Sequence, residues 1–306
     1  LGYVYKREGE TMNELERVRS QAVGQEVDQE LMERYPVQSQ EKMEFPTRYG
    51  TVTAYVYRPF SEQEKLPVLI NFHGGGFVKG YRGRDFGFSR ILAVNGQCLV
   101  VDVDYKIAPE YKYPYAVEEG YDLVRHIQEK ADSLGGDSGR IVLSGESAGA
   151  NMITAILFML KKAGNPMPLG AVSCYPPYDL YTDAGEKPGA GQEPERVKNA
   201  RLYNDWYVEP ERRKEICASP VCASKEELTD LPPFTILAAE HDTLCQEALE
   251  FARKLVEAGV TVTAKKIKGA RHGFLVRRTE GYLEGEALFF SALKTYFSDF
   301  GKGERK

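Results

Sequence analysis

The sequence predicts an α/β fold built around a mostly parallel β-sheet. From Leu66 onward, short apolar runs of strand-favouring residues alternate with segments of helical periodicity, which is the pattern of repeated β-α-β units. Ahead of them, residues 42–49 and 51–58 alternate in polarity on either side of Gly50, as an antiparallel hairpin does. A chain of 306 residues, 42% of them hydrophobic, is long enough for one large core or for two ordinary domains.

Strands and helices are expected to alternate along the rest of the chain. Each expected strand is a short apolar run, and each expected helix lies between two such runs with apolar residues at helical spacing. The strands are expected at residues 67–72, 98–104, 140–144, 170–174, 234–239 and 261–267, and the helices at residues 85–95, 115–135, 148–163 and 245–258. Because a helix usually connects parallel strands, this order predicts eight strands flanked by helices, with the antiparallel pair first.

Two segments do not fit the alternation. Residues 11–35 have helical periodicity but are strongly charged, and residues 181–218 combine a Gly-, Pro- and Glu-rich stretch with an aromatic cluster. Neither is large enough for a core of its own, so we expect a single domain with a small helical cap; the alternative is an N-terminal arm and a surface insertion. The expected division of residues 1–306 is a core at about 41–176 and 221–306 and a cap at about 1–40 and 177–220.

The charge balance excludes several classes of function. The chain has 40 Lys and Arg against 45 Asp and Glu, a formal net charge of −5, which leaves no excess of basic residues for phosphate backbones or anionic membranes. The longest apolar stretch, residues 153–160, is far shorter than the roughly 20 residues that cross a bilayer. We therefore expect no nucleic-acid partner and no membrane association.

The cysteines and the first residues predict the compartment. Five scattered cysteines favour a reducing environment over a disulfide framework. Residues 1–10 carry charged side chains where a signal peptide would have its apolar core, so the predicted location is cytoplasmic. Cys217 and Cys222 are the closest pair, but no second Cys or His pair accompanies them, and we expect buried thiols and no metal site.

A Gly-x-Ser-x-Gly motif supplies a candidate nucleophile. An apolar strand leads into Gly145-Glu-Ser147-Ala-Gly149, and a helix follows. The two glycines let the chain fold so tightly that Ser147 is held on a strained turn with its hydroxyl exposed. The strand, turn and helix that this motif requires are all present, and they predict Ser147 at the carboxyl edge of the sheet.

A serine hydroxyl becomes a good nucleophile only when a neighbouring base takes its proton. His272 follows the last expected strand in a loop with glycine on both sides, and we expect it to be that base. The other histidines are expected elsewhere: His126 in the middle of a helix, His73 in a loop beside three glycines, and His241 at a strand end before an acidic residue.

An acid that orients the histidine is expected between nucleophile and base in the chain if the fold is of the α/β-hydrolase type. Asp242 ends a strand 95 residues after Ser147 and 30 residues before His272, and the second interval accommodates one helix and one strand. These three residues are therefore predicted to meet at one edge of the sheet. The rival at the same strand end is Glu240, and Asp230 and Asp179 are more distant candidates.

A run of three glycines at residues 74–76 supplies candidate oxyanion donors. It follows the expected strand at residues 67–72, and glycine lets backbone amides approach a ligand closely. Preorganised N–H donors stabilise the negative charge that forms on an attacked carbonyl, and we expect them at Gly75, Gly76 and Ala148. A flexible loop or a phosphate nest is the alternative, but the sequence has neither a P-loop nor a dinucleotide-binding glycine motif.

Four ordered motifs resemble those of the hormone-sensitive-lipase-like family of α/β-hydrolase esterases: His73-Gly-Gly-Gly-Phe77, Asp104-Tyr-Lys-Ile-Ala-Pro-Glu110, Gly145-Glu-Ser-Ala-Gly149 and His272-Gly-Phe274. The likeness extends from about residue 66 to residue 297. It implies an α/β-hydrolase fold with a helical cap, a serine carboxylesterase acting on short acyl groups from acetyl to about hexanoyl, and no cofactor. It implies the same nucleophile, acid, base and oxyanion donors as the spacing.

Two positions depart from the family pattern. The family usually has Asp-Pro-Leu at the acid, whereas this chain has Asp242-Thr-Leu244, which affects the geometry of the loop more than the identity of the acid. Glu146 stands before the nucleophile where Asp is commoner. We expect Glu146 to have a supporting role and not a chemical one.

The expected substrate is a small neutral ester. A peptidase or amidase on the same fold is the rival activity, because a catalytic triad alone does not choose between ester and amide. A receptor for a small acidic ligand is the rival from another class, although such proteins lack a working histidine. Family analogy implies a homodimer through the strand at residues 261–267. The expected substrate contacts are His73, Gly74, Phe77, Trp206 and Phe274.

Overall fold

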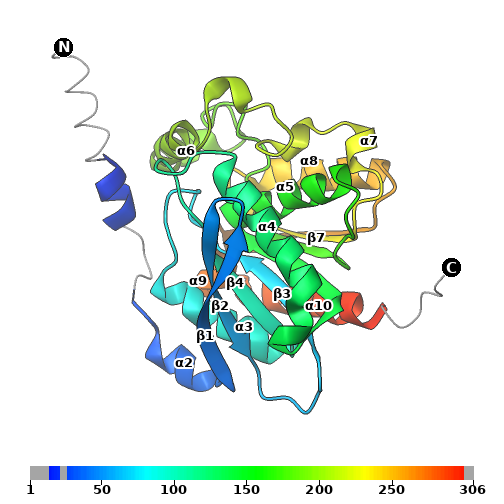
Figure 1. Ribbon diagram of the computed structural model, residues 1–306. Coiled ribbons are helices and arrows are strands. Elements are labelled where there is room, and N and C mark those ends of the chain that lie inside the picture. Colours follow the sequence, from blue (N-terminus) through cyan, green and yellow to red (C-terminus); the bar gives the residue numbers. More distant parts are fainter. Residues whose placement is uncertain (1–13, 21–25, 300–306) are drawn as a thin grey trace.

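The computed structural model describes residues 14–20 and 26–299 and has the predicted α/β fold. The strands in this part of the chain are β1 (Ser39–Thr47), β2 (Gly50–Arg58), β3 (Leu66–Phe72), β4 (Leu99–Asp104), β5 (Gly136–Glu146), β6 (Ala171–Cys174), β7 (Phe234–His241) and β8 (Val262–Arg271). They form one sheet in the order β1-β2-β4-β3-β5-β6-β7-β8 (Figure 1). The pairs β1 with β2 and β2 with β4 are antiparallel, and all the other pairs are parallel.

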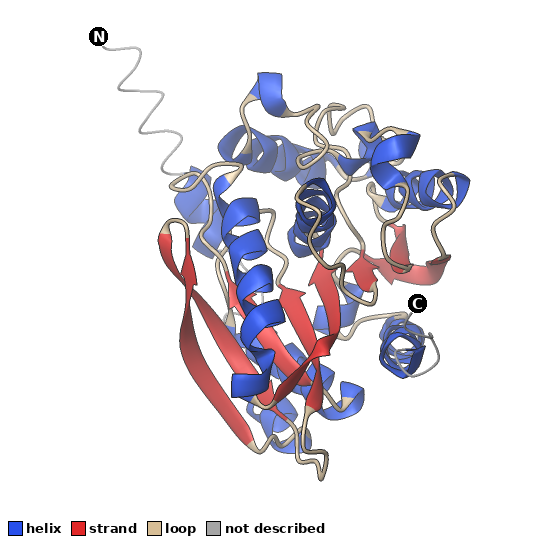
Figure 2. Cartoon of the chain, turned by 45° about the vertical axis from the view of Figure 1, so that its right-hand side comes forward, coloured by secondary structure: helices blue, strands red, loops and turns tan. Residues whose placement is uncertain are grey.

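Helices cover both faces of the sheet (Figure 2). The described α-helices with assigned bounds are α2 (Gln29–Arg34), α3 (Gly83–Gly96), α4 (Tyr115–Lys130), α5 (Ala148–Lys162), α6 (Pro194–Tyr207), α7 (Lys225–Leu228), α8 (Cys245–Glu257), α9 (Phe274–Arg277) and α10 (Tyr282–Asp299). Short 3₁₀ helices are η1 (Ala131–Leu134), η2 (Ala190–Gln192), η3 (Pro210–Arg212) and η4 (Pro220–Cys222). On one face lie α4, α5 and α8, and on the other lie α3 and α10.

The hydrophobic core has two layers, one on each side of the sheet. All seven residues of β3 are buried. Val68 and Ile70 belong to the layer under α4, α5 and α8, whereas Leu69 belongs to the layer under α3 and α10. Because both faces of these central parallel strands are covered, their sequences are continuously apolar instead of alternating. This arrangement fixes the carboxyl ends of the strands, where the predicted site residues lie.

Most of the predicted elements are present, but some boundaries differ. The helix expected at residues 115–135 ends at Lys130, because η1 and the left-handed Gly135 (φ +70°) turn the chain there. As a result, β5 begins at Gly136, before the expected residue 140. The sequence reading missed α10 altogether. This helix buries Leu293 but leaves Leu283 67% exposed, so its apolar residues do not form the single stripe that predicts a surface helix.

The structure describes one of the two predicted cap segments in full and the other only in part. The connection between β6 and β7 contains α6 and α7, which lie at the top of the molecule in Figure 1. Residues 14–20 are helical, and they bury Leu15 and Val18 against the layer that contains α4. The rest of the predicted N-terminal cap segment falls partly on residues 1–13 and 21–25, which lie outside the described residues. Residues 1–10, where the sequence predicts no export signal, also lie outside the described residues.

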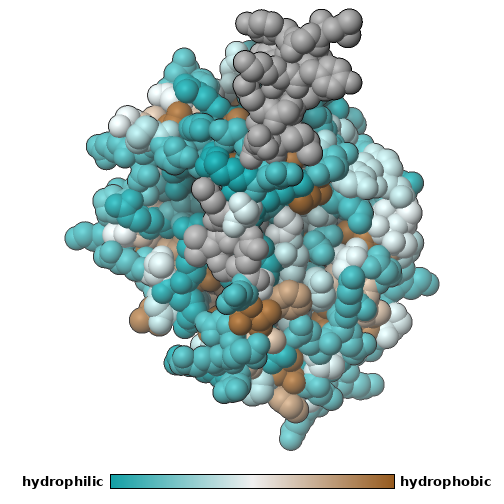
Figure 3. Space-filling view, turned by 90° about the vertical axis from the view of Figure 1, so that its left-hand side faces the viewer, coloured by the Kyte–Doolittle hydropathy of each residue, from teal (hydrophilic) through white to brown (hydrophobic). Residues whose placement is uncertain are grey.

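The face on the left of Figure 1, where α2 lies, is mainly hydrophilic, and hydrophobic residues show on it only in small groups (Figure 3). Within residues 14–20 and 26–299, every helix is too short or too polar to cross a bilayer. All five cysteines are free thiols, and two of them, Cys98 and Cys174, are buried. The expectation of buried thiols at Cys217 and Cys222 is corrected, because Cys217 is only partly buried and Cys222 is exposed.

Candidate active site

Ser147 stands alone between the end of β5 and the start of α5. Its backbone has φ +52° and ψ −116°, a conformation that a residue with a side chain rarely adopts. The flanking glycines allow this turn, because a Cβ on Gly149 would lie 1.8 Å from the carbonyl oxygen of Phe72. A Cβ on Gly145 would lie 2.4 Å from the carbonyl carbon of Gly149. The strained turn predicted from the motif is therefore present, and it raises the Ser147 hydroxyl above the sheet.

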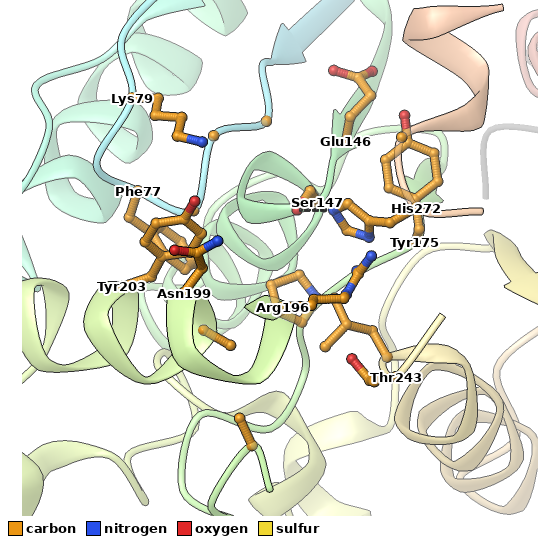
Figure 4. Close-up of a pocket in the computed structure, with 18 of the residues that line it drawn as sticks. Phe77, Lys79, Glu146, Ser147, Tyr175, Arg196, Asn199, Tyr203, Thr243 and His272 are labelled. Carbon is orange, nitrogen blue, oxygen red and sulfur yellow. Dashed lines mark hydrogen bonds between the residues drawn. The ribbon is translucent and has the colours of Figure 1, made fainter. Parts of the chain in front are cut away.

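Three predicted residues form one chain of hydrogen bonds. His272 Nε2 lies 2.9 Å from Ser147 Oγ (Figure 4), and His272 Nδ1 lies 2.6 Å from Asp242 Oδ2. Asp242 directly follows β7 and His272 directly follows β8. The parallel strands β5, β7 and β8 end at the same edge of the sheet. Asp242 therefore comes together with Ser147, 95 positions before it, and with His272, 30 positions after it. In this tautomer Nδ1–H donates to the carboxylate and Nε2 accepts from the serine hydroxyl.

The rival acids lie elsewhere. Glu240 points to the neighbouring strand, where it accepts a hydrogen bond from Gly269 N at 2.9 Å. Asp179 accepts hydrogen bonds from the backbone N–H groups of Tyr181 and Thr182. Among the acids weighed from the sequence, the structure brings only Asp242 to His272 within the described chain.

A second partner of Asp242 comes from α6. Arg196 Nη2 lies 2.6 Å from Asp242 Oδ1, and Leu244 N donates to the same oxygen at 3.0 Å. The carboxyl is only 1% exposed, so each of its oxygens is committed to a protein partner. The sequence analysis did not predict Arg196 as a partner of Asp242. No motif or spacing rule connects it to Asp242, because the contact depends on how α6 packs over the strand ends.

The surroundings of His272 and Asp242 shift both pKa values. Burial lowers the pKa of His272 from its usual range, Asp242 opposes that shift, and the Arg196 guanidinium adds to it. Burial alone would raise the pKa of Asp242, but the charge and hydrogen bond of His272, together with Arg196, hold it below its ordinary value. Asp242 is therefore ionised and His272 is neutral near pH 7, as a general base and its orienting acid require.

The glycine loop after β3 forms one wall of the site. Gly75 has φ +153° and Gly76 has φ +62°, and the N–H groups of Val78 and Lys79 both donate to Gly75 O. A Cβ on Gly75 would meet Lys79 O at 2.6 Å, so the loop is too tight for a side chain there. Within the described residues, the amides of Gly75 and Gly76 donate to no protein acceptor.

A cavity of about 470 Å³ opens above Ser147 and His272. The glycine loop lies on one side, and α6 closes another with Arg196, Asn199 and Tyr203 (Figure 4). The Tyr203 ring presses on the glycine loop, since a Cβ on Gly76 would lie 2.5 Å from that ring. The cavity therefore joins the predicted nucleophile to residues from three separate parts of the chain.

Two of the predicted substrate contacts line this cavity and three do not. Gly74 and Phe77 are on its wall. His73, Trp206 and Phe274 are at most 5% exposed and lie behind the wall. The expectation that these three side chains touch substrate is therefore corrected: they support the residues that line the cavity.

The reason differs for each of the two motif residues that were misassigned. His73 stacks on Tyr105 at 4.3 Å and donates from Nδ1 to the carbonyl of Gly74 at 2.9 Å, so it holds the glycine loop from below. Phe274 packs edge to face on Tyr175, 5.4 Å between ring centroids. A motif shows that a residue is near a site, but not on which side of the backbone its side chain lies.

A buried polar network lies beneath the predicted nucleophile. Asn71 donates to Asp102 at 3.1 Å and to Glu146 at 3.4 Å, and it accepts a hydrogen bond from Ser144 at 2.7 Å. Burial raises the pKa of Asp102 to about 7, and it raises the pKa of Glu146 well above its usual range. Burial therefore favours the protonated form of Glu146. Its contact with Asn71 agrees with the expected supporting role of the residue before Ser147.

Comparison with known proteins extends beyond this geometry. The sequence pattern of the α/β-hydrolase fold matches residues 69–276. The chain is 30% identical over 232 residues to the esterase LipI of Mycobacterium tuberculosis, covering 74% of this chain and 72% of the relative. It is 32% identical over 228 residues to the carboxylesterase NlhH of the same bacterium, covering 72% and 70%.

Solved structures give the same answer. An esterase of the hyperthermophilic archaeon Pyrobaculum calidifontis superimposes with a TM-score of 0.82 at 30% identity, and the alignment covers 93% of each chain. A fungal esterase of Rhizomucor miehei superimposes with a TM-score of 0.82 at 30% identity, covering 89% and 87%. The motifs, the sheet order and these likenesses agree. The chain belongs to the hormone-sensitive-lipase-like family of the α/β-hydrolase fold and is a carboxylic ester hydrolase.

Proposed function

We propose that this enzyme hydrolyses esters of short acyl groups, acetyl to about hexanoyl, through an acyl-enzyme. The observation that carries the proposal is the hydrogen-bonded chain from Ser147 through His272 to Asp242 at the floor of the cavity. In this proposal Ser147 is the nucleophile, His272 the general base and Asp242 the residue that orients it.

Each step follows from this arrangement. His272 Nε2 takes the hydroxyl proton as Ser147 Oγ attacks the ester carbonyl, and the carbonyl oxygen becomes an anion. The N–H groups of Gly75, Gly76 and Ala148 are the proposed donors to this anion, since they flank the nucleophile and the glycine amides are unused by the protein. His272 then gives its proton to the departing alcohol. Water, activated by the same nitrogen, releases the acid and restores Ser147.

We propose that residues 177–220, together with the N-terminal segment to about residue 40, act as a cap that limits acyl length. The support is the position of α6, whose Tyr203 packs on Gly76 and narrows the cavity next to Ser147. A cavity of about 470 Å³ lies at the lower end of the range for small-ligand sites. A long acyl chain would have to displace α6.

A series of 4-nitrophenyl esters from acetate to dodecanoate tests both parts of this proposal. We expect the largest kcat/KM between two and six acyl carbons, and a loss of about 10⁴-fold or more in Ser147→Ala. Ser133→Ala, which changes an exposed serine in η1, is the matched control and should keep full activity. Undiminished hydrolysis by Ser147→Ala would contradict the nucleophile. Faster turnover of dodecanoate than acetate would contradict the cap, and faster turnover of an aminoacyl 4-nitroanilide than of any ester would favour the amidase alternative.

We further propose a cytoplasmic enzyme that pairs through β8. The support for pairing is that β8 is the last strand of the sheet and therefore has an unpaired edge. Three lysines, Lys265, Lys266 and Lys268, lie on this strand, and their charges would oppose a second copy at low salt. Light scattering at low and at high salt should show a dimer that strengthens with salt; a monomer at both would contradict the pairing.

A further inference from the structure

The cavity above Ser147 is rich in cationic side chains. Six of the described residues that line it are basic: Lys79, Arg82, Arg84, Lys187, Arg196 and Arg277. Four are acidic: Asp85, Glu146, Glu193 and Glu195. A net charge of −5 for the whole chain favoured a neutral substrate, but the charges that face the cavity have the opposite balance. The question is which of the basic side chains already have a carboxylate partner.

Three of the four acids on the wall form ion pairs, and burial raises the pKa of the fourth. Asp85 lies 3.4 Å from Arg82 and 3.6 Å from Arg84, so it serves two cations. Glu146 is buried, and burial raises its pKa well above the usual range, which favours its uncharged form. The other two acids are paired with arginines that do not line the cavity: Glu193 with Arg271 at 3.0 Å and Glu195 with Arg17 at 3.6 Å.

Two of the basic residues have strong partners of their own. Lys187 lies 2.6 Å from Glu247, and Arg196 lies 2.6 Å from Asp242. After these pairs are counted, Lys79 and Arg277 remain: neither forms an ion pair with any residue in the described part of the chain. Lys79 instead has its ammonium 5.4 Å from the centre of the Tyr203 ring.

Lys79 and Arg277 each lie in a short backbone segment that also holds residues of the proposed site. Lys79 belongs to the turn that holds the glycine loop, where its N–H donates to Gly75 O at 3.1 Å, and its side chain lies beside the cavity in Figure 4. Arg277 lies on α9, one turn after His272, and its side chain folds back so that Nε lies 3.4 Å from where a Cβ on Gly273 would be. Both side chains line the cavity that contains Ser147, so an anion bound by them would share that cavity with Ser147.

These cations also repel one another. Burial, together with Arg82, Arg84 and Arg277, lowers the pKa of Lys79 to about 8, so Lys79 keeps its charge at neutral pH in surroundings that disfavour it. A bound anion would relieve this repulsion, and in a partly enclosed cavity the attraction is stronger than in water. A neutral ester would leave Lys79 and Arg277 facing each other's charge without compensation.

We propose that the ester substrate carries a carboxylate, which Lys79 and Arg277 bind beside Ser147. The inference rests on the proposed function of Ser147 and narrows its substrate class from small esters to anionic ones. The carboxylate belongs either to the acyl part, as in a half-ester of a dicarboxylic acid, or to the alcohol part, as in an acylated hydroxy acid. Both sources present the same anion to the same two cations.

Two matched substrate pairs distinguish these sources. For the alcohol part, 4-acetoxybenzoate is compared with the neutral 4-acetoxybenzamide. For the acyl part, mono-4-nitrophenyl glutarate is compared with 4-nitrophenyl hexanoate, after subtraction of the uncatalysed rate. We expect the anionic member of at least one pair to have a kcat/KM about tenfold or more above that of its neutral partner, since a hydrogen bond to a charged group typically contributes at least that much.

The variants Lys79→Gln and Arg277→Gln test the residues. We expect each to lower the ratio of anionic to neutral kcat/KM, and the double variant to remove the whole preference of about tenfold or more. Lys42→Gln changes the net charge equally at an exposed site on β1, and it should leave the ratio unchanged. Thermal melting of each variant separates a lost contact from a lost fold.

The outcomes separate this inference from the proposed function. Ser147-dependent hydrolysis of the neutral esters with no anionic preference in either pair would overturn the carboxylate proposal and leave the esterase mechanism intact. A preference that survives in the double variant would overturn the assignment to Lys79 and Arg277. If no ester is hydrolysed in a Ser147-dependent way, the proposed function itself fails.

Discussion

Arg196 extends the line of contacts that begins at Ser147 and runs through His272 to Asp242. Motif spacing predicted the first three of these residues because each directly follows a strand of the same sheet. Arg196 lies on α6 and contacts Asp242 at 2.6 Å, and it adds a positive charge to a buried acid and base. The consequence is electrostatic, since this charge lowers the pKa of His272, the proposed general base.

Removing this charge should move the acid limb of the pH profile. Only neutral His272 can take the serine proton, so kcat/KM falls as the pH drops below the pKa of His272, which lies below its ordinary value near 6.5. Because Arg196 lowers that pKa, Arg196→Gln should raise it and shift the limb to higher pH. The measurement is kcat/KM for 4-nitrophenyl acetate between pH 4 and 9.

The matched control for this shift is Arg201→Gln on the same helix. Arg201 pairs with Asp183 on the surface, so its loss changes the net charge equally without reaching His272. An unmoved acid limb in Arg196→Gln, or an equal shift in Arg201→Gln, would show that the contact with Asp242 does not tune the base.

Gly149 should not tolerate even one added methyl group. Its Cβ would lie 1.8 Å from the carbonyl oxygen of Phe72 and 2.9 Å from that of His73, and backbone on both sides cannot easily move. We expect Gly149→Ala to lower the free energy of unfolding by about 3 kcal/mol or more. Urea unfolding measures this loss. Gly191→Ala, where an added Cβ meets nothing within 4 Å, should change it by about 0.5 kcal/mol or less.

At the scale of elements, an aromatic stack ties α6 to the glycine loop. The rings of Phe77 and Tyr207 lie 3.7 Å apart and within 5° of parallel, and Tyr207 O accepts a hydrogen bond from Tyr113 N at 2.8 Å. Phe77 is the residue after Gly76, so this stack sets the position of the loop. The stack therefore holds the glycine loop and α6 together.

Two substitutions at Tyr207 separate its ring from its hydroxyl. The hydroxyl is buried and has no hydrogen-bond partner among the described residues, so Tyr207→Phe should leave stability equal or slightly higher. Tyr207→Ala removes the stack, and it should cost about 3 to 5 kcal/mol and lower kcat/KM as the glycine loop loosens. Urea unfolding and ester hydrolysis report the two effects. Equal stability of the two variants would mean that the ring does not hold the loop.

The elements that the sequence predicted well are those whose pattern is local. The apolar run of β3 and the glycines around Ser147 each depend on neighbours a few residues away. The missed features depend on distant packing. Leu283 is exposed and Leu293 is buried on the same helix, which obscures the amphipathic pattern of α10, and the contact of Arg196 with Asp242 joins residues 46 positions apart.

For the whole molecule, the buried acids make stability depend on pH. Burial raises the pKa of Asp102 and of Glu119 to about 7, whereas these carboxyls lose their protons near pH 4 in an unfolded chain. The folded state therefore binds more protons between about pH 4 and 7, and the free energy of unfolding should fall as the pH rises through that window. Urea unfolding at pH 5 and pH 7.5 measures the difference.

Two aspartates with opposite surroundings check this sign. Asp102→Asn should reduce the loss of stability between pH 5 and 7.5, because the group that titrates is gone. Asp132→Asn removes an exposed carboxyl whose pKa Lys65 lowers; this group is already ionised at pH 5 in both the folded and the unfolded chain, so its removal should leave the difference between pH 5 and 7.5 unchanged. Equal effects from both substitutions would show that burial of Asp102 does not control the slope.

The connection between β6 and β7 also matters for engineering. The proposed nucleophile, base and acid come from the ends of β5, β8 and β7, whereas α6 contributes a separate part of the cavity wall. Replacing residues 181–218 by the corresponding stretch of a relative would therefore exchange selectivity while the reacting groups stay in place. One position limits such a graft: a donor without a cation at residue 196 would also change the proton affinity of the base, so a new preference would come with a new working pH.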